Sequence, residues 1–390
     1  MLKGALNYMK VLWICGLPRQ VQEGELGGRD YGAHAEWSWI LGHLPPPNNV
    51  ELHITCPSIK VRKPKKIKYS GCTFHLVPCL PGRLQVGFLL DPFFFRGIVK
   101  KLNPDVVHGW GTEDSYSVMV QTLAPEKCVV QVQGLINAYR NYLPNTLGIK
   151  YVALQERKTL SRARTVFVES GYSKEITEPY CGEKTSIIQV DHPLRSSFLK
   201  TPSASGRGQE ILFLGSICER KGYQDAVTAF QQLPNMEWKM TLVGNGSPQD
   251  VAELNEQIAQ VSVAGRITHI PQASSDTIVE LMQRASIFLL PSKMDTGPTA
   301  LKEALAMGLW PICYANSGPK EYITRFGYGS LASTGDVVEL AEQLKTAVDK
   351  KPWLHNERLE MLVSRVRHEL CADTIWQQLI RHYHDIAKEI

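Results

Sequence analysis

Short apolar runs recur along the first half of the chain and have the length of buried strands. Most of them are continuous rather than alternating, which is typical of parallel strands covered on both faces. The runs are residues 11–15, 52–56, 74–77, 106–108, 128–132, 165–168 and 187–190. We therefore expect a parallel sheet with covering helices in this half of the chain.

The pattern then pauses and restarts. Residues 196–208 are rich in Ser, Pro and Gly and poor in apolar residues, so we interpret them as a linker. New apolar runs follow at residues 211–214, 240–243, 267–270, 287–290 and 310–313. Two consecutive arrays of strands and helices predict an α/β protein with two Rossmann-like domains facing a cleft, at residues 1–195 and 209–370.

Two helices are indicated by apolar residues at helical spacing. The first has Ser275 as its expected N-cap, and its buried face is Ile278, Val279, Leu281, Met282 and Ala285. The second, at 371–390, has the stripe Ile375, Trp376, Leu379, Tyr383 and Ile386. Sequence position alone does not say which domain receives this last helix; packing back on the first domain is one arrangement.

Composition narrows the class of protein. A chain of 390 residues is too long for one ordinary core, and 43% hydrophobic with 21% charged residues is typical of a globular protein. The net charge of +5 and the pI near 8.6 suit anionic ligands but give no nucleic-acid signature. No apolar stretch reaches the roughly 18 residues of a membrane span, and we find no signal peptide, so we expect a cytoplasmic enzyme.

Cysteine and histidine spacing indicates neither a disulfide framework nor a metal centre. The nine cysteines are scattered without a C-x-x-C pair, and the eleven histidines form no H-x-x-x-H set. No D-x-D constellation lies at a strand end either. We therefore expect no metal ligands.

The segment 287–308 carries the most informative chemical pattern. An apolar strand precedes a loop that holds Asp295, and a helix then begins near Pro298 and ends before Gly308. Glu303 follows Asp295 by eight residues and lies about one turn into this helix. Ligands of open α/β sheets bind at the carboxyl ends of strands, and a helix N-terminus there binds phosphate. Two carboxylates beside an anion site suit a nucleotide sugar.

Four stretches, in order, resemble the donor domain of retaining, GT-B-fold glycosyltransferases of family 4 (glycosyl transferases group 1). Asp295-x7-Glu303 resembles the E-x7-E motif of that family, and residues 214–222 resemble its strand and loop ending in Lys-Gly. Residues 242–246 resemble its L-V-G-x-G strand end, and residues 282–292 resemble the segment that leads into the paired acids. The resemblance covers residues 211–331 and extends more weakly over most of the chain.

The resemblance implies roles for the two acids. In the family the first acid contacts hydroxyls of the donor sugar and the second contacts the ribose of the nucleotide. The resemblance therefore implies that Asp295 contacts the sugar and that Glu303 contacts the ribose. Asp295 is one methylene shorter than the usual Glu. Without the resemblance, Asp295 is an ordinary helix N-cap and Glu303 a solvated helix acid. The residues expected beside the donor phosphate are Gly297, Pro298, Thr299 and Ala300.

Lys221 and Arg220 follow a strand that ends at Gly215. A cation pair here would stabilise the charge that builds on the leaving diphosphate. The family often carries an Arg directly after this glycine, where the present chain has Ser216, and Arg220 is a nearby replacement. As surface cations at a helix start they would oppose the helix dipole, which favours a bound anion instead. Gly215 and Lys221 are therefore expected to lie in the binding site of the donor nucleotide sugar.

Candidate residues in the first domain are fewer. Gly27 and Gly28 follow the first strand and resemble the glycine loop of the family, which approaches phosphate or sugar. Many family members have a His after the strand that corresponds to residues 128–132, but this chain has Gln133, which takes no proton at neutral pH. His108 ends the preceding run and is the candidate base. In retaining transfer the leaving phosphate can itself accept the proton, so a missing base does not exclude activity.

Two segments bear on partners. The basic run 60–68 could meet anionic lipid headgroups or a pyrophosphate-linked acceptor, although a solvated loop is the simpler interpretation. The aromatic run 88–95 suits membrane docking if it is exposed, and a buried segment explains it equally well. The two segments are compatible with a position at the inner face of the membrane but do not predict it.

The resulting hypothesis is a retaining glycosyltransferase that moves a sugar from a nucleotide-diphosphate donor to a hydroxyl of a glycan or lipid-linked acceptor. It needs no metal and no cofactor besides that donor substrate. Two alternatives stay open. A non-catalytic nucleotide- or glycan-binding relative fits the departures at Ser216, Asp295 and Gln133. A GT-B-fold sugar-nucleotide epimerase fits the diphosphate site, but the absent cleft histidine weakens it. Nucleic acid is not an expected partner.

Overall fold

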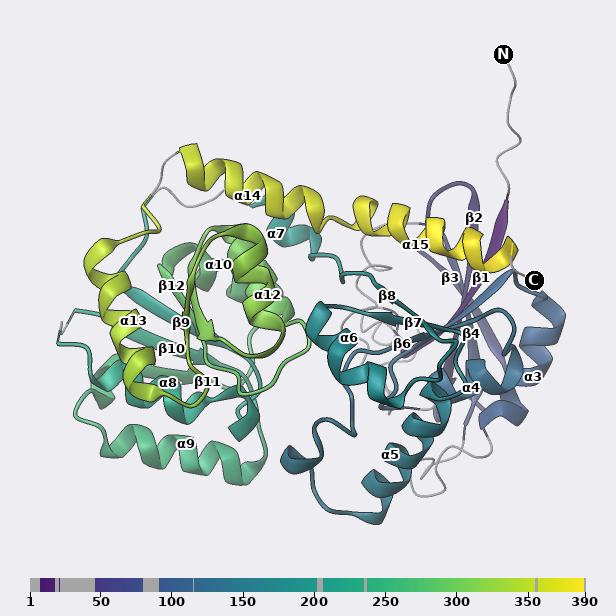
Figure 1. Ribbon diagram of the computed structural model, residues 1–390, viewed down its shortest axis with the longest axis horizontal. Helices are drawn as coiled ribbons and strands as arrows, with labels where there is room; N and C mark the ends of the chain where they lie inside the picture. Colours follow the sequence, from purple (N-terminus) through teal and green to yellow (C-terminus); the bar gives the residue numbers. More distant parts are fainter. Residues whose placement is uncertain are drawn as a thin grey trace. The chain divides into compact units, whose positions relative to one another are not determined.

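The structure is a computed structural model that describes residues 8–17, 21, 46–79, 91–114, 116–201, 206–234, 237–354 and 357–388. The chain divides into two compact units, shown in Figure 1. Unit 1 comprises Met1–Pro193 and Ala372–Ile390, and unit 2 comprises Leu194–Cys371. The segment interpreted as a linker is thus part of unit 2, and it contains the short helix α7 (Ser196–Lys200).

Unit 1 is built on an eight-stranded sheet with the strand order β3-β4-β2-β1-β5-β6-β7-β8. Its strands are β1 (Met9–Ile14), β2 (Val50–Ser58), β3 (Lys65–Tyr69), β4 (Cys72–Pro78), β5 (Val106–Trp110), β6 (Cys128–Gln131), β7 (Thr165–Val168) and β8 (Ser186–Gln189). Every pairing is parallel except that of β3 with β4. The parallel strands arise from the continuous apolar runs of the sequence.

The interpretation of the basic run 60–68 as a loop is wrong for its second half. Residues 60–64 lie outside any strand or helix, whereas residues 65–68 belong to strand β3. Lys65, Lys66 and Lys68 of this strand are exposed and Ile67 is buried in the core. The strand lies at the edge of the sheet, where exposed lysines oppose pairing with another chain.

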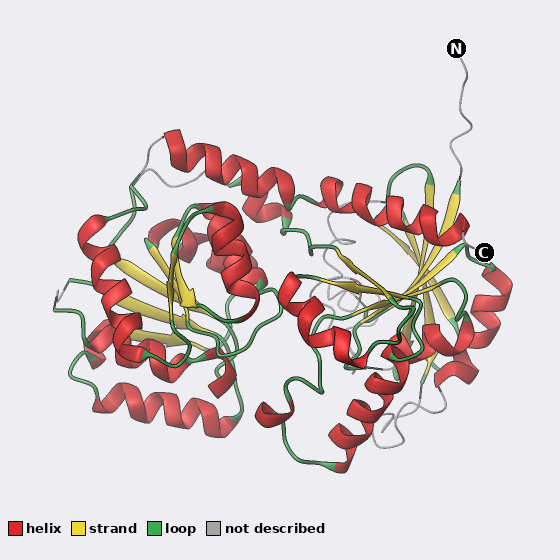
Figure 2. Ribbon diagram, viewed as in Figure 1, coloured by secondary structure: helices red, strands yellow, loops and turns green. Residues whose placement is uncertain are grey.

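Helices cover both faces of the unit 1 sheet, as Figure 2 shows. They are α3 (Asp91–Leu102), α4 (Tyr116–Leu123), α5 (Leu147–Leu160), α6 (Gly171–Thr177) and α15 (Ala372–Lys388). Residues of α3 and α4 join one apolar cluster of the sheet, and the whole predicted stripe of α15 joins the other. The C-terminal helix therefore packs on the unit formed by the start of the chain (Figure 1).

Unit 2 is a six-stranded parallel sheet with the order β11-β10-β9-β12-β13-β14. Its strands are β9 (Glu210–Leu214), β10 (Lys239–Val243), β11 (Ile267–Ile270), β12 (Ile287–Leu290), β13 (Trp310–Tyr314) and β14 (Ser330–Ala332). Its helices, besides α7, are α8 (Tyr223–Gln231), α9 (Pro248–Gln260), α10 (Ser275–Arg284), α11 (Thr299–Met307), α12 (Ser317–Phe326), α13 (Val337–Lys350) and α14 (Glu357–Glu369). The two units have the Rossmann-like architecture expected from the sequence.

Local signals set the helix ends in unit 2 with small shifts from expectation. The N-cap of α10 is Ser274 rather than Ser275, because the Ser274 hydroxyl accepts the Thr277 N–H at 3.1 Å. Pro298 lies at the N-cap of α11, and Gly308 ends that helix with a φ of 77°. Few residues other than glycine adopt this left-handed conformation, so the stop signal is as the sequence indicates.

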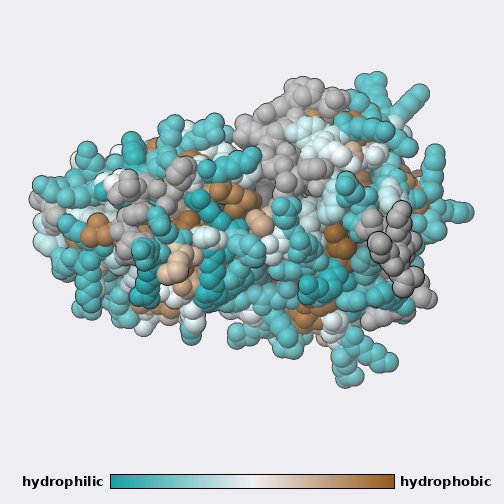
Figure 3. All heavy atoms as spheres, turned by 90° about the horizontal axis from the view of Figure 1, so that it is seen from above, coloured by the Kyte–Doolittle hydropathy of each residue, from teal (hydrophilic) through white to brown (hydrophobic). Residues whose placement is uncertain are grey.

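The face drawn in Figure 3 is mostly hydrophilic with scattered apolar spots. Residues 88–90 of the aromatic run lie outside the described residues. Within the rest of the run, Phe93 on α3 is 80% exposed whereas Phe95 is buried in the core of unit 1. A single exposed aromatic side chain is common on protein surfaces. Among the described residues, no helix has the length and apolarity needed to cross a membrane.

Candidate active site

A lysine and an aspartate meet at the carboxyl edge of the unit 2 sheet. Strands β9 and β12 are neighbours, so the loops that follow them lie side by side. Lys221 belongs to the short 3-10 helix η4 (Glu219–Lys221) after β9, and Asp295 belongs to the loop after β12. The Lys221 Nζ and the Asp295 Oδ2 form an ion pair, with side chains 15% and 8% exposed. The structure thus brings together two residues that the sequence places in one site.

Close backbone approach makes this pairing possible. Gly222 has a φ of 73°, and a Cβ there would lie 2.0 Å from the carbonyl oxygen of Pro291. Only glycine fits this position, which presses η4 against the end of β12. A Cβ on Gly215 would lie 3.7 Å from the Lys221 Cδ, so the lysine stem runs over the backbone of that glycine. The expected donor residues Gly215 and Lys221 are therefore adjacent.

Arg220 ties the same two loops together. One guanidinium nitrogen donates to the Met294 carbonyl at 2.9 Å, and the Arg220 carbonyl accepts the Lys293 N–H at 2.8 Å. Asp295 is held further by its own N–H, which donates to the Ser317 hydroxyl at 3.3 Å. Arg220 therefore lies in the site, where its hydrogen bonds to Met294 and Lys293 position the Asp295 loop.

The N-terminus of α11 opens beside this pair. The helix has no side-chain cap because its N-cap residue is Pro298, so the first-turn amides of Thr299 and Ala300 lack a capping side chain. Gly297 and Pro298 form the turn that leads from Asp295 into the helix. A helix start without a side-chain cap, next to a lysine, is suited to a phosphate group.

Glu303 is buried on α11 with 1% exposure and is paired with Arg195. The Arg195 Nε donates to Glu303 Oε1 at 2.6 Å, and a terminal nitrogen donates to Oε2 at 2.8 Å. Sequence analysis missed Arg195. No local pattern could have found it, since 108 residues separate it from its partner.

The interpretation of His108 as a catalytic residue is wrong. The side chain has 0% exposure in the middle of β5, which runs on to Trp110. Its Nδ1 lies 2.6 Å from the Tyr383 hydroxyl of α15, and its ring stacks on Trp110 at a centroid distance of 4.3 Å. Burial holds the pKa of His108 well below its usual value. The His108 side chain thus packs between β5 and α15 instead of lying at the carboxyl edge of the sheet. The loop residues Gly27 and Gly28 lie outside the described residues.

Two acids that the sequence analysis did not single out lie at the carboxyl edge of the unit 1 sheet. Glu113 follows β5 and is half-buried, and its Oε1 accepts the Gly134 N–H at 2.5 Å. Desolvation raises the pKa of Glu113 to about 7, opposed by backbone hydrogen bonds. The fully buried Glu156 accepts from the Thr112 hydroxyl at 2.7 Å and from the Ile136 and Asn137 backbones at 3.0 and 2.9 Å.

Solved structures with the same architecture define the class of fold. The chain is similar to sucrose-phosphate synthase of Thermosynechococcus elongatus, with a TM-score of 0.74, 15% identity and coverage of 97% and 99% of the two chains. It is similar to HepE of Anabaena in complex with UDP-glucose, with a TM-score of 0.70, 14% identity and coverage of 97% and 100%. The fold is therefore GT-B, with two Rossmann-like domains.

A family match falls within the sequence of unit 2. Residues 199–367 match the family described as Glycosyl transferases group 1. Relatives include the amylovoran biosynthesis glycosyltransferase AmsK of Erwinia amylovora, 29% identical over 41% of this chain and 40% of that protein. Another is 2-deoxystreptamine glucosyltransferase of Streptomyces kanamyceticus, 25% identical over 36% and 37%. The matches span roughly half or less of these relatives.

Proposed function

We propose that the protein is a retaining glycosyltransferase that transfers a sugar from a nucleotide-diphosphate sugar to an acceptor hydroxyl in glycan biosynthesis. The observation that carries the proposal is the Lys221–Asp295 pair at the carboxyl edge of β9 and β12, beside the α11 N-terminus without a side-chain cap. Its cation and amides suit a diphosphate, and its carboxylate suits sugar hydroxyls. The match of residues 199–367 to the glycosyltransferase group 1 family and the similarity to AmsK support this proposal.

Each residue has one task in this mechanism. Lys221 and the amides of Thr299 and Ala300 stabilise the negative charge that develops on the diphosphate as its bond to the sugar breaks. Asp295 orients the sugar through its hydroxyls, and Glu303 accepts hydrogen bonds from the ribose. The acceptor oxygen forms the new bond on the same face of the sugar, and its proton passes to the leaving phosphate. Because these groups supply the charge stabilisation, we propose a metal-independent reaction.

A donor screen tests the proposal. The protein is incubated with UDP-, GDP-, ADP- and CMP-sugars, and thermal stabilisation and nucleotide release are measured without acceptor. One diphosphate sugar should stabilise the protein and be hydrolysed slowly, and both effects should be lost in Lys221→Ala. The CMP-sugar, which has one phosphate, is the control for diphosphate recognition. Stabilisation without release would favour a binding-only relative, and no stabilisation by any nucleotide would contradict the proposed site.

A further inference from the structure

Glu303 is a buried carboxylate that forms a bidentate pair with Arg195. The two Arg195 nitrogens reach one oxygen each, at 2.6 and 2.8 Å, which is the geometry of a strong charge-assisted pair. A carboxylate with 1% exposure is stable in its charged form only with such compensation. Arg195 therefore contributes to both the charge and the direction of Glu303.

Arg195 is itself held by contacts from two other helices. Its remaining terminal nitrogen donates to the Ser275 hydroxyl at the start of α10 at 3.0 Å. Its guanidinium carbon lies 4.8 Å from the ring centroid of Phe198 on α7. The guanidinium thus connects α7, α10 and α11 near the carboxyl edge of the sheet, where α10 and α11 begin. A planar group fixed from several sides can set the direction of the carboxylate that it binds.

The pairing is compatible with a second set of hydrogen bonds. A carboxylate has about four lone-pair sites, and a bidentate guanidinium uses two of them. A ribose presents two adjacent hydroxyl donors, whereas a deoxyribose lacks one of them. An ionised and correctly oriented carboxylate accepts hydrogen bonds from both hydroxyls, so it favours a ribonucleotide over a deoxyribonucleotide. A protonated or wrongly oriented carboxylate loses most of this preference for the ribonucleotide.

Resting on the proposed function, we propose that Arg195 is a positioning residue that sets selectivity for ribonucleotides by orienting Glu303 toward the donor ribose. Arg195 acts through Glu303 and does not contact the diphosphate, which Lys221 binds. Its loss should therefore weaken binding of ribonucleotides while leaving binding of deoxyribonucleotides unchanged. A merely structural role would weaken both alike.

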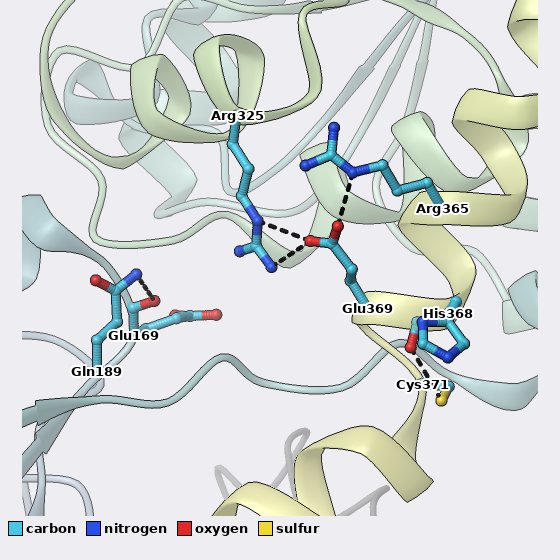
Figure 4. Close-up of polar contacts among 7 residues, drawn as sticks. All are labelled: Glu169, Gln189, Arg325, Arg365, His368, Glu369 and Cys371. Atoms are coloured by element: carbon cyan, nitrogen blue, oxygen red, sulfur yellow. Dashed lines mark hydrogen bonds and ion pairs between the residues drawn. The ribbon is translucent and has the colours of Figure 1, made fainter.

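A second arginine–glutamate pair in unit 2 provides a matched control. Arg325 on α12 donates to Glu369 Oε2 at 3.0 and 2.6 Å, and Arg365 donates to Oε1 of the same acid at 2.7 Å (Figure 4). This pair joins α12 to α14 and includes none of the proposed donor residues. Arg325→Met thus removes an arginine–glutamate ion pair of unit 2 that is not part of the proposed site.

The test is calorimetric titration of the full chain with UDP, GDP and ADP, and with the 2′-deoxy and 3′-deoxy forms of whichever binds most tightly. We expect the wild-type protein to prefer the ribonucleotide by about tenfold or more. In Arg195→Met the preference should fall to about twofold or less, with the deoxynucleotide Kd unchanged. Arg195→Lys keeps the positive charge but cannot form the bidentate pair, so it should retain part of the preference for the ribonucleotide. Arg325→Met should retain the whole preference.

The outcomes separate this inference from the proposed function. If the wild-type protein binds no nucleotide, the proposed function fails and the inference with it. If it binds nucleotides without ribose preference, or Arg195→Met keeps the preference, the inference alone is overturned. If Arg195→Met does not fold, Arg195→Lys carries the test, and equal weakening of ribo- and deoxynucleotide binding in that variant overturns the inference.

Discussion

The two units hold buried acids at the carboxyl edges of their sheets in different ways. In unit 2, Asp295 is paired with Lys221 and Glu303 with Arg195. In unit 1, Glu113 and Glu156 accept hydrogen bonds from backbone N–H groups and neutral side chains, and within the described part of the chain no cation pairs with either. A cation keeps an acid charged and oriented, whereas neutral donors compensate burial only in part.

This difference indicates a division of labour. The unit 2 edge presents fixed charges of both signs, which suits a ligand carrying phosphates and hydroxyls. In unit 1, Glu156 on helix α5 accepts hydrogen bonds from Thr112, which follows β5, and from Ile136 and Asn137, which follow β6. These bonds connect the helix to two loops at the sheet edge, which indicates a structural role for Glu156. Substitutions at each edge should therefore affect different properties: turnover in unit 2 and stability in unit 1.

The largest expected effect is that of Lys221→Ala on turnover. Removing the cation leaves the developing charge on the leaving diphosphate without its fixed partner, so release of nucleotide from the donor should slow by about 10²-fold or more. The matched control is Lys293→Ala, because Lys293 lies on the same loop as Asp295 and pairs with Glu219 at 3.2 Å. That variant should remain within about twofold of the wild type. Equal losses in the two variants would mean that Lys221 acts only through general charge.

The next effect is on the stability of unit 1. Glu156→Ala removes the carboxylate acceptor of two backbone N–H groups, and it leaves the Thr112 hydroxyl and the Asn137 side chain with only their second acceptors, the Gly134 and Ala153 carbonyls. Breaking a buried network of this kind should lower the free energy of unfolding by on the order of 3 kcal/mol. Urea unfolding measures the loss, with Lys158→Ala at an exposed position of the same helix as control. A change below about 0.5 kcal/mol would contradict the structural role.

At the carboxyl edges of the two sheets, features set by neighbouring residues in the sequence were predictable. Features that depend on contacts between distant segments were not. The four residues of β12 are all fully buried, so a continuous apolar run identified the strand and the loop that holds Asp295. The Lys-Gly turn at Gly222 likewise reflects a local backbone requirement. The contact of His108 with Tyr383, by contrast, joins residues that are 275 positions apart in the sequence. The residues near His108 therefore gave no signal that α15 would bury its side chain.

The same reasoning explains the missed acids. Glu113 and Glu156 lie in no motif, and their proximity arises only when β5, β6 and α5 assemble. The strand β3 was missed because one buried residue among lysines gives a weak apolar signal. Spacing in the sequence therefore placed Lys221 and Asp295 at the same sheet edge, where the structure pairs them, while the acids of the unit 1 edge come together only in the fold.

The smallest expected effect concerns the pH dependence of stability. Desolvation, with the nearby Glu156 charge adding to it, raises the pKa of Glu113 to about 7 in the folded protein. An unfolded glutamate has a pKa of about 4.3, so between about pH 4.5 and 7 the folded state holds a proton that the unfolded state has lost. The free energy of unfolding should therefore fall as the pH rises through this interval, and the loss should persist above pH 7.

Glu113→Gln should remove this dependence. The amide keeps an oxygen that can accept the Gly134 N–H and carries no charge at any pH. The variant should match the wild type near pH 4.5 and be more stable by on the order of 1 kcal/mol at pH 8, an amount reduced by the partial exposure of the side chain. Urea unfolding of both proteins at pH 5, 6, 7 and 8 measures the difference. A difference that is constant with pH would show that Glu113 ionises normally, and the contrast between the paired acids of unit 2 and the unpaired acids of unit 1 would then be one of geometry alone.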